Sequence, residues 1–247
     1  MDPLAMAAAS GLRSRMQSLD MLANNLANSG TSGFKSDREF YGLFVSPDAS
    51  GDAQDESQTT APMIERQWTD FSQGSLQPTG NQFDVGLSGR GFLTVNGPSG
   101  VLYTRNGSMH VSNTGQLMSG DGYPIRSAGG GTLAITSGKA VEIGKDGSVR
   151  QDGRTLGQLE LVDFKSTDSL KKAGGACFQN ADPRNLPVAA TDVRVEQGQT
   201  EASNVAVPEA AMRLVGVMRQ FEMLQKAVTM GVEMNRKAIE EVAKVGA

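Results

Sequence analysis

Apolar residues recur at seven-residue intervals near the start of the chain. Leu12, Leu19 and Leu26 share this spacing, and Leu22 lies on the same face. A helix with 3.6 residues per turn gathers such positions into one stripe. The pattern therefore predicts a helix from about residue 3 to residue 27. Pro3 suits its first turn, where a missing amide hydrogen costs nothing.

The residues after this stripe are those of a helix end. We expect Asn28, Ser29 and Gly30 to close the helix, because Asn and Gly tolerate the left-handed backbone conformation. The chain would then turn away from the helix before residue 34. The predicted turn residues are Asn28, Gly30 and Gly33.

The last forty residues repeat the apolar pattern. The stripe predicts a helix from about 207 to 244, with Pro208 and Glu209 in its first turn. Gly216 and Gly231 each weaken that helix by up to about 1 kcal/mol relative to alanine. The stripe positions expected to pack are Leu214, Met218, Phe221, Leu224 and Val228.

Each predicted helix is apolar on one side only. Burying a leucine or phenylalanine is worth roughly 1.5–3 kcal/mol, so both stripes need a partner. The two ends can pair as a coiled coil, with helices of neighbouring subunits added, or pack as an ordinary helix pair on one core. Periodicity alone does not decide between these arrangements.

Between the helices the pattern changes to short apolar runs separated by turn dipeptides. Turns are predicted at RNGS, GDGY and KDGS, and one short helix at 166–175 with Ser166 as its cap. The fold class is α+β, with a mainly antiparallel all-β middle domain. The predicted segments are 1–45 (N-terminal helix and turn), 46–62 (an acidic, flexible linker), 63–200 (β domain) and 201–247 (C-terminal helix).

Composition and the absence of certain segments argue against some classes of function. A net charge of −4 argues against nucleic-acid binding, which needs a basic surface. No apolar run approaches the roughly 20 residues of a membrane span, and we expect no membrane insertion. The N-terminus has no basic leader before an apolar stretch, so we expect no cleaved signal peptide.

Candidate catalytic residues are few. His110 and Cys177 are the sole histidine and cysteine, which excludes sites with several His or Cys ligands. We expect His110 to be a half-exposed strand residue and Cys177 a small buried one. A glycosidase-type carboxylate pair would have to come from Asp84, Asp121, Asp146, Asp152, Glu160 and Asp163, several of which lie at turns. We expect no catalytic site, cofactor or metal.

Five stretches resemble the bacterial flagellar axial proteins, the rod and hook subunits. In this chain, LANNLANSGTSGFKSDREFY is similar to the family's N-terminal signature, and EASNVAVPEAAMRLVGVMRQFEM is similar to its C-terminal signature. QGSLQPTGNQFDVGLSGRGFLTV, YTRNGSMHVSNTGQLMSGDGYPI and LVDFKSTDSLKKAGGACFQN resemble parts of the rod proteins' β domain. The chain is too short for a hook subunit, and its length slightly favours a proximal-type rod protein.

The resemblance implies a structural subunit of the flagellar basal-body rod. Such subunits assemble helically, with copies of themselves and other rod or hook proteins, into the drive shaft that transmits torque from motor to hook. It also implies export through the flagellar type III apparatus and a periplasm-spanning location. The nine stripe residues would pack within and between subunits, and the turn at Asn28–Gly33 would lead the chain from the axial core to the β domain.

Two other classes of function stay open at this point. The chain could be a periplasmic β-domain binding module, for peptidoglycan or a protein, that its terminal helices dimerise. It could also be a cell-wall hydrolase, which would need a carboxylate pair that the sequence does not clearly supply. A closed dimer would distinguish the first from a subunit that polymerises.

Overall fold

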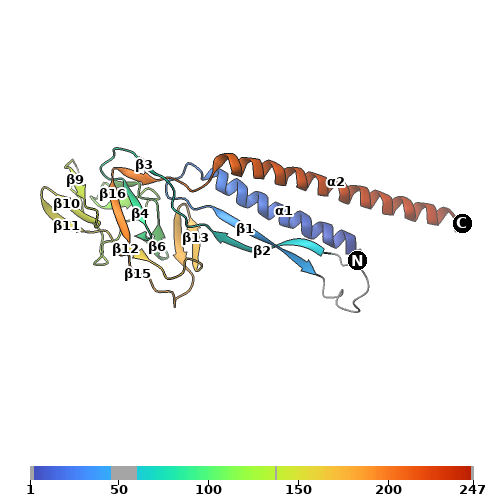
Figure 1. The fold of residues 1–247 in the computed structure, drawn as a ribbon, viewed down its shortest axis with the longest axis horizontal. Helices are drawn as coiled ribbons and strands as arrows, with labels where there is room; N and C mark the ends of the chain where they lie inside the picture. The colour runs from blue at the N-terminus through green and yellow to red at the C-terminus, as the bar shows by residue number, and fades with distance from the viewer. Residues whose placement is uncertain (1–2, 46–59, 137, 246–247) are drawn as a thin grey trace. The chain divides into compact units, whose positions relative to one another are not determined.

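The computed structural model describes residues 3–45, 60–136 and 138–245 (Figure 1). The chain divides into two compact units. We call one the helix unit, with residues 1–27, 37–68 and 206–247, and the other the β unit, with residues 28–36 and 69–205. Two terminal helices and a mainly antiparallel β middle confirm the α+β class.

Two long helices form most of the helix unit. Helix α1 spans Pro3–Ala27 and helix α2 spans Val207–Val245, as the two apolar stripes predict. They lie side by side and antiparallel (Figure 1). In α2 the first helical hydrogen bond runs from the amide of Ala210 to the carbonyl of Ala206, 2.9 Å away. Glu209 lies in this first turn, where the helix dipole favours a negative charge. No helix among the described residues has an apolar stretch long enough to cross a membrane.

A two-stranded ribbon completes the helix unit. Strand β1 (Asp37–Val45) pairs with strand β2 (Thr60–Thr69). An isolated ribbon is marginally stable in water, so its contacts with α1 matter. The Asn25 side chain donates to the carbonyl of Asp37 at 2.8 Å and accepts from the Asp37 amide at 2.9 Å. Ser18 donates to the Glu39 carboxylate at 2.8 Å. The predicted linker 46–62 overlaps β2 at 60–62, and its residues 46–59 lie outside the described residues.

The β unit contains short strands in several antiparallel sheets. The widest sheet has the order β13-β14-β6-β5-β12-β15, and a three-stranded sheet has the order β11-β10-β9. The remaining pairs are β16–β4, β17–β3 and β7–β8. The strands are β3 (Leu76–Pro78), β4 (Val85–Gly89), β5 (Phe92–Gly97), β6 (Gly100–Thr104), β7 (Met109–Val111), β8 (Leu117–Ser119), β9 (Val141–Ile143), β10 (Ser148–Gln151), β11 (Arg154–Gln158), β12 (Leu161–Asp163), β13 (Leu170–Gly174), β14 (Cys177–Asn180), β15 (Val188–Ala189), β16 (Val193–Gln197) and β17 (Gln199–Glu201).

The widest sheet has a hydrophobic cluster on each face. Alternate residues of a strand point to opposite faces, and β5 places Leu93 and Val95 in the larger aliphatic cluster and Phe92 in an aromatic one. On β14, Cys177 belongs to the first cluster and Phe178 to the second. Burial on both faces explains why β5 begins with four consecutive buried residues, Phe-Leu-Thr-Val, instead of alternating buried and exposed ones.

Two local predictions are wrong. Residues 166–175 form no helix: Ser166 Oγ accepts from the Asp168 amide at 3.2 Å, and the chain then enters β13, which pairs with β14. Leu170 is buried in the aromatic cluster, so sheet pairing overrides the local helix signal. The Asn-Gly dipeptide at 106–107 is a buried crossing between β6 and β7, which pair with other strands.

The other turn predictions are confirmed. Gly147 donates to the carbonyl of Gly144 and has φ +81°, in the connection between β9 and β10. Gly122 donates to the carbonyl of Ser119, with φ +82°. These glycines adopt the left-handed conformation that tight turns require.

Candidate functional site: helix faces and a buried charge cluster

The predicted leucine stripe of α1 is only partly buried. Leu22 is 4% exposed, whereas Leu12, Leu19 and Leu26 are half-buried. The most buried face of α1 runs alongside this stripe and is made mostly of small and polar residues. Its members are Gly11, Ser14, Ser18, Met21, Leu22 and Asn25.

This small and polar face explains how α1 packs. A Cβ atom at Gly11 would lie 3.8 Å from Cδ1 of Leu224 on α2, so the two helices approach closely there. Ser18 and Asn25 hydrogen-bond to β1, as described above. The seven-residue spacing of Gly11, Ser18 and Asn25 is visible in the sequence, but these residues are not apolar and so do not belong to the hydrophobic stripe.

The predicted residues of α2 form the side that lies toward α1. Leu214, Phe221, Leu224 and Val228 are half-buried, and Met218 is 47% exposed. A second group of apolar side chains on α2 was missed. Met212, Met223, Met230 and Met234 are each 62–70% exposed, and Val215 and Val232 are also exposed. Large exposed apolar groups along one element indicate a surface that another molecule covers.

Helix α2 is also longer than its partner helix. It has 39 residues and α1 has 25, so it is longer by about 20 Å at 1.5 Å per residue. Since the helices are antiparallel and Gly11 lies against Leu224, the C-terminal part of α2 extends past the start of α1. Val232 and Met234 lie there, 63% and 69% exposed.

The predicted turn residues differ in importance. Neither Asn28 nor Gly30 has a positive φ, so the expected left-handed helix end is wrong at these positions. The turn closes instead through the Thr31 amide, which donates to the Asn28 carbonyl at 3.1 Å. A Cβ at Gly30 would have open space around it. Gly33 is the left-handed residue, with φ +69°.

Gly33 lies against the backbone of the β unit. A Cβ atom there would be 2.2 Å from the Asn106 nitrogen, a distance that no side chain can adopt. The Gly33 amide donates to the Glu201 carbonyl at 2.7 Å. Next to it, Phe34 is buried and its ring lies 4.0 Å from Lys172 Nζ. Glycine is therefore needed at 33 and not at 30.

A cluster of three buried charged residues lies beside this segment. Lys35 and Glu201 have fully buried side chains and form an ion pair. Arg105, 6% exposed, donates from Nη1 to Glu201 Oε2 at 3.2 Å. Glu201 also accepts from the Gly74 amide at 2.9 Å. We call Lys35, Arg105 and Glu201 the buried charge cluster.

The cluster has two cations but only one carboxylate, and main-chain carbonyls supply further hydrogen-bond acceptors for the cations. Lys35 Nζ donates to the Ser72 carbonyl at 2.7 Å. Arg105 Nη2 donates to the Gly89 carbonyl at 2.7 Å, and its guanidinium lies 5.3 Å from the Phe92 ring centre. Burial lowers the pKa of Lys35 and of Arg105, while Glu201 opposes both shifts. Removing one member of such a cluster leaves a buried charge uncompensated.

A second polar contact fixes the same segments. Asn204 Oδ1 accepts from the Ser36 amide at 2.8 Å, and its Nδ2 donates to the Asp70 carbonyl at 2.7 Å. Together with the charge cluster, Asn204 holds residues 33–36, 70–74 and 201–204 on the β unit. The sequence contains these residues in FKS and EASN, but nothing in their pattern marks them as buried.

The cluster has no features of a catalytic site. Shifted pKa values often mark active sites, but these side chains are sealed from solvent and bonded to one another. The candidate carboxylates each have a local structural partner. Asp84 accepts from Asn81, Asp152 pairs with Lys139, Asp163 with Arg90 and Glu160 with Arg126. Asp121 accepts from Asn106, and Asp146 from Ser148.

The two single-copy residues lie where the sequence predicts. His110 is an exposed residue of strand β7. Cys177 is buried, and burial together with Asp121 raises the pKa of its thiol to about 12. A thiol that keeps its proton is a poor nucleophile. Among the described residues, no three His, Cys, Asp or Glu side chains are grouped to hold a metal.

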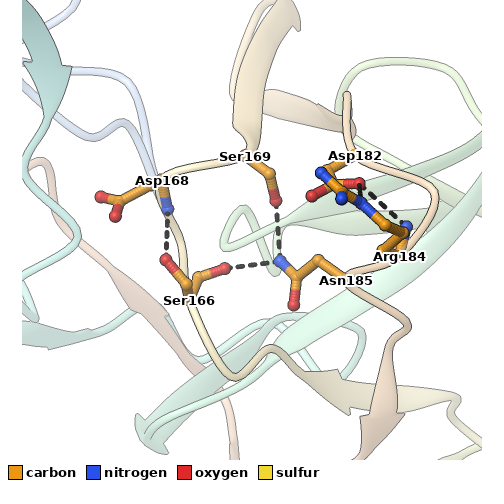
Figure 2. A pocket seen from close by; sticks show the side chains of 6 residues that line it. All are labelled: Ser166, Asp168, Ser169, Asp182, Arg184 and Asn185. Atoms are coloured by element: carbon orange, nitrogen blue, oxygen red, sulfur yellow. Dashed lines mark hydrogen bonds and ion pairs between the residues drawn. The ribbon is translucent and has the colours of Figure 1, made fainter.

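One open polar depression lies between the loops around 166–169 and 182–185 (Figure 2). Asn185 Nδ2 donates to the Ser166 carbonyl and to Ser169 Oγ, both at 2.7 Å. Asp182 pairs with Arg184 at its rim. These groups bond to each other across the depression, so they hold the two loops together and present no converging set of groups to a ligand.

Three segments of the chain match family models. Residues 7–35 match a flagella basal body rod protein model, residues 86–151 the flagellar hook protein FlgE/F/G D1 domain, and residues 196–241 the flagellar basal body rod FlgEFG protein C-terminal model. Each member of the buried charge cluster comes from a different one of these segments. The cluster therefore joins all three.

Curated relatives match almost end to end. The flagellar basal-body rod protein FlgF of Caulobacter vibrioides is 31% identical over 231 residues, covering 92% of each chain. FlgG of Bacillus subtilis is 28% identical, covering 93% of this chain and 95% of the relative. FlgG of Buchnera aphidicola subsp. Schizaphis graminum is 30% identical, with 92% and 95% covered. The chain belongs to the flagellar basal-body rod protein family.

Proposed function

We propose that this chain is a structural subunit of the flagellar basal-body rod, without catalysis. Copies of it, together with other rod or hook proteins, assemble helically into the drive shaft that carries torque from motor to hook. The names of the relatives support the rod, and no observation favours the periplasmic binding module. The proximal position stays a prediction, since the relatives include both FlgF and FlgG.

The observation that carries the proposal is the apolar surface left on the helix unit. Leu12, Leu19 and Leu26 are half-buried on α1, while Met223 and Met230 are exposed on α2. Two different apolar faces on one protein can pair head to tail, and a heterologous contact that does not close propagates into a filament. The seven-residue spacing suits coiled-coil packing of these helices within and between subunits.

The β unit supplies the other property a shaft needs. Both segments that connect it to the terminal helices, residues 28–36 and 201–205, are anchored on it by the charge cluster and Asn204. We infer that this anchoring keeps the connection stiff under load. Export through the flagellar type III apparatus and a periplasm-spanning position belong to the same proposal.

Sedimentation velocity over a range of concentrations tests the proposal. The dilute chain is expected to be a monomer, and higher concentrations should yield open-ended oligomers of increasing size. Leu19→Asp should abolish this growth, whereas Asp20→Asn, an exposed neighbour, should leave it unchanged. A dimer that stays constant in size at all concentrations would contradict a rod subunit and favour the binding module.

Limited proteolysis of the dilute monomer provides an independent check. Loss of both chain ends, leaving a resistant core of about 63 to 200, is expected if the helices become fully ordered on assembly. Terminal helices as resistant as the β unit would indicate a self-contained protein and count against the proposal.

A further inference from the structure

Helix α2 carries five of the twelve methionines of the chain, and all five are exposed. Four of them, which we call the methionine face, are Met212, Met223, Met230 and Met234, with exposed fractions of 70%, 62%, 62% and 69%. Their spacings of 11, 7 and 4 residues place them within about 40° of one another around the helix. They lie along one side of the helix.

The methionine face points away from α1. Leu224 and Val228 lie on the side toward α1, and at 100° per residue they are about 80–160° around the helix from the methionines. Packing of α1 against α2 within one chain therefore does not cover the stripe. Of the occupants that could cover it, a helix of a second copy of this chain fits the length of the stripe and the part of α2 that has no α1 alongside it.

Three of the other sulfur atoms of known burial are protected. Met21 and Met109 are 9% and 3% exposed. Cys177 is fully buried, and its pKa of about 12 keeps it as a thiol, whereas oxidants attack the thiolate. Met16 on α1, 54% exposed, is the other strongly exposed methionine of known burial outside α2. An oxidant in solution therefore meets the methionine face before the sulfur atoms of Met21, Met109 and Cys177.

We propose that the methionine face is a site of reversible oxidation by peroxide in the unassembled subunit, and that oxidation prevents this face from packing against a second copy. The effect on packing rests on the proposed rod function. In the reaction a thioether sulfur attacks one oxygen of hydrogen peroxide. The S–O bond forms as the O–O bond breaks, the sulfur loses two electrons, and the second oxygen leaves as water.

The sulfoxide changes what the face can bury. A flexible apolar side chain becomes a polar one with a strong acceptor oxygen. Between two apolar helix faces that oxygen finds no donor, and an acceptor buried without a partner opposes association. Assembled copies would shield the same sulfur atoms, so the switch acts on subunits before they are incorporated.

Peroxide treatment of the full-length chain, followed by peptide mass spectrometry, tests the site. The four methionines should gain one oxygen at least about tenfold faster than Met21 and Met109. Equal oxidation of buried and exposed methionines would overturn the proposal. This readout requires no assembly.

Sedimentation velocity then tests the consequence. The oxidised chain should need at least about tenfold higher concentration to polymerise. Methionine sulfoxide reductases for both epimers, with dithiothreitol as reductant, should reverse this by releasing the oxygen as water and leaving the dithiol as a disulfide. The variant M212L/M223L/M230L/M234L keeps an apolar face without oxidisable sulfur, and its polymerisation should be insensitive to peroxide.

The outcomes separate this proposal from the rod function. An oxidised chain that polymerises like the untreated one would overturn the switch and leave the rod function intact. An untreated chain that never polymerises would refute both self-assembly and the switch, while the mass spectrum would still decide whether the site exists. Equal peroxide sensitivity of the leucine variant would show that other residues are responsible and would overturn the assignment to this face.

Discussion

The two units of the protein bury their apolar residues to very different degrees. In the β unit, Val85, Leu87 and Leu93 are fully buried within one cluster. In the helix unit, Met212 and Met234 are about 70% exposed. The β unit has a complete core, whereas the helix unit still has surface to bury. From this difference we expect the β unit to be stable by itself and the helix unit to gain stability on assembly.

Loss of the carboxylate at the buried charge cluster is expected to have the largest effect on the β unit. Glu201→Gln leaves Lys35 and Arg105 buried without a counter-charge, which should lower the free energy of unfolding by about 3–5 kcal/mol. Urea unfolding followed by near-ultraviolet circular dichroism measures this. Glu142→Gln, on an exposed position of β9, is the matched control. A loss below about 1 kcal/mol would show that the cluster does not hold the β unit together.

The next effect separates the two glycines of the turn. Gly33→Ala places a Cβ into the backbone at Asn106 and strains φ, which should cost about 2–4 kcal/mol. Gly30→Ala meets open space and should change the free energy of unfolding by less than about 0.5 kcal/mol. The same urea titration compares them. Equal effects would mean that residues 28–36 are not anchored on the β unit.

Alkaline pH tests the burial of Cys177. Its pKa in the folded chain is about 12, above the 9.0 of an exposed thiol. Between these values the unfolded chain loses the thiol proton and the folded chain keeps it, so stability falls as pH rises. The loss is about 1.4 kcal/mol per pH unit above pH 9.

A comparison with Cys177→Ala isolates this contribution. The variant has no thiol to titrate, so its unfolding free energy should fall less steeply above pH 9 than that of the native chain. Urea titrations at several pH values provide the two slopes. Parallel slopes would indicate that the thiol is as accessible when folded as when unfolded.

The smallest effect on the monomer is expected on the helix unit. Leu19→Ala truncates a half-buried side chain and should lower the unfolding free energy of the helix unit by less than about 1 kcal/mol. Leu22→Ala, at a position 4% exposed, should cost about 2 kcal/mol or more. Fluorescence of Trp68, the single tryptophan, reports on this unit.

The effect of Leu19→Ala on assembly should be larger than its effect on the stability of the monomer. Although Leu19→Ala is expected to change the monomer little, it should clearly raise the concentration needed for polymerisation, because the proposed packing between subunits would bury the rest of this half-buried side chain. Sedimentation velocity measures that concentration. An unchanged polymerisation threshold would remove Leu19 from the proposed packing surface.

The sequence predicts the helices and most strands because their signals are local. Stripes of period 3.6 locate α1 and α2, and Asp-Gly dipeptides locate the turns after β8 and β9. The helix expected at 166–175 fails because pairing with β14 outweighs local propensity. The Asn-Gly turn at 106 fails for a similar reason, since Gly107 lies against Val85 in the folded chain.

The charge cluster could not be predicted, because its members are far apart in the chain. Lys35 and Arg105 are separated by 70 positions, and Arg105 and Glu201 by 96. A lysine or glutamate in a polar segment is normally exposed, and only the fold shows that these are buried. The methionine face had a signal in the sequence. It was missed because Met223, Met230 and Met234 lie outside the stripe that was followed.

The chain passes between its two units four times, after residues 27, 36, 68 and 205. Two domains joined by one flexible linker can rotate freely about it, and a twist applied to one does not reach the other. With four covalent connections in parallel, no single bond can act as a swivel. A twist applied to the helices must then deform several backbone connections at once. In a rotating shaft, the four connections in each subunit would therefore oppose twisting within that subunit.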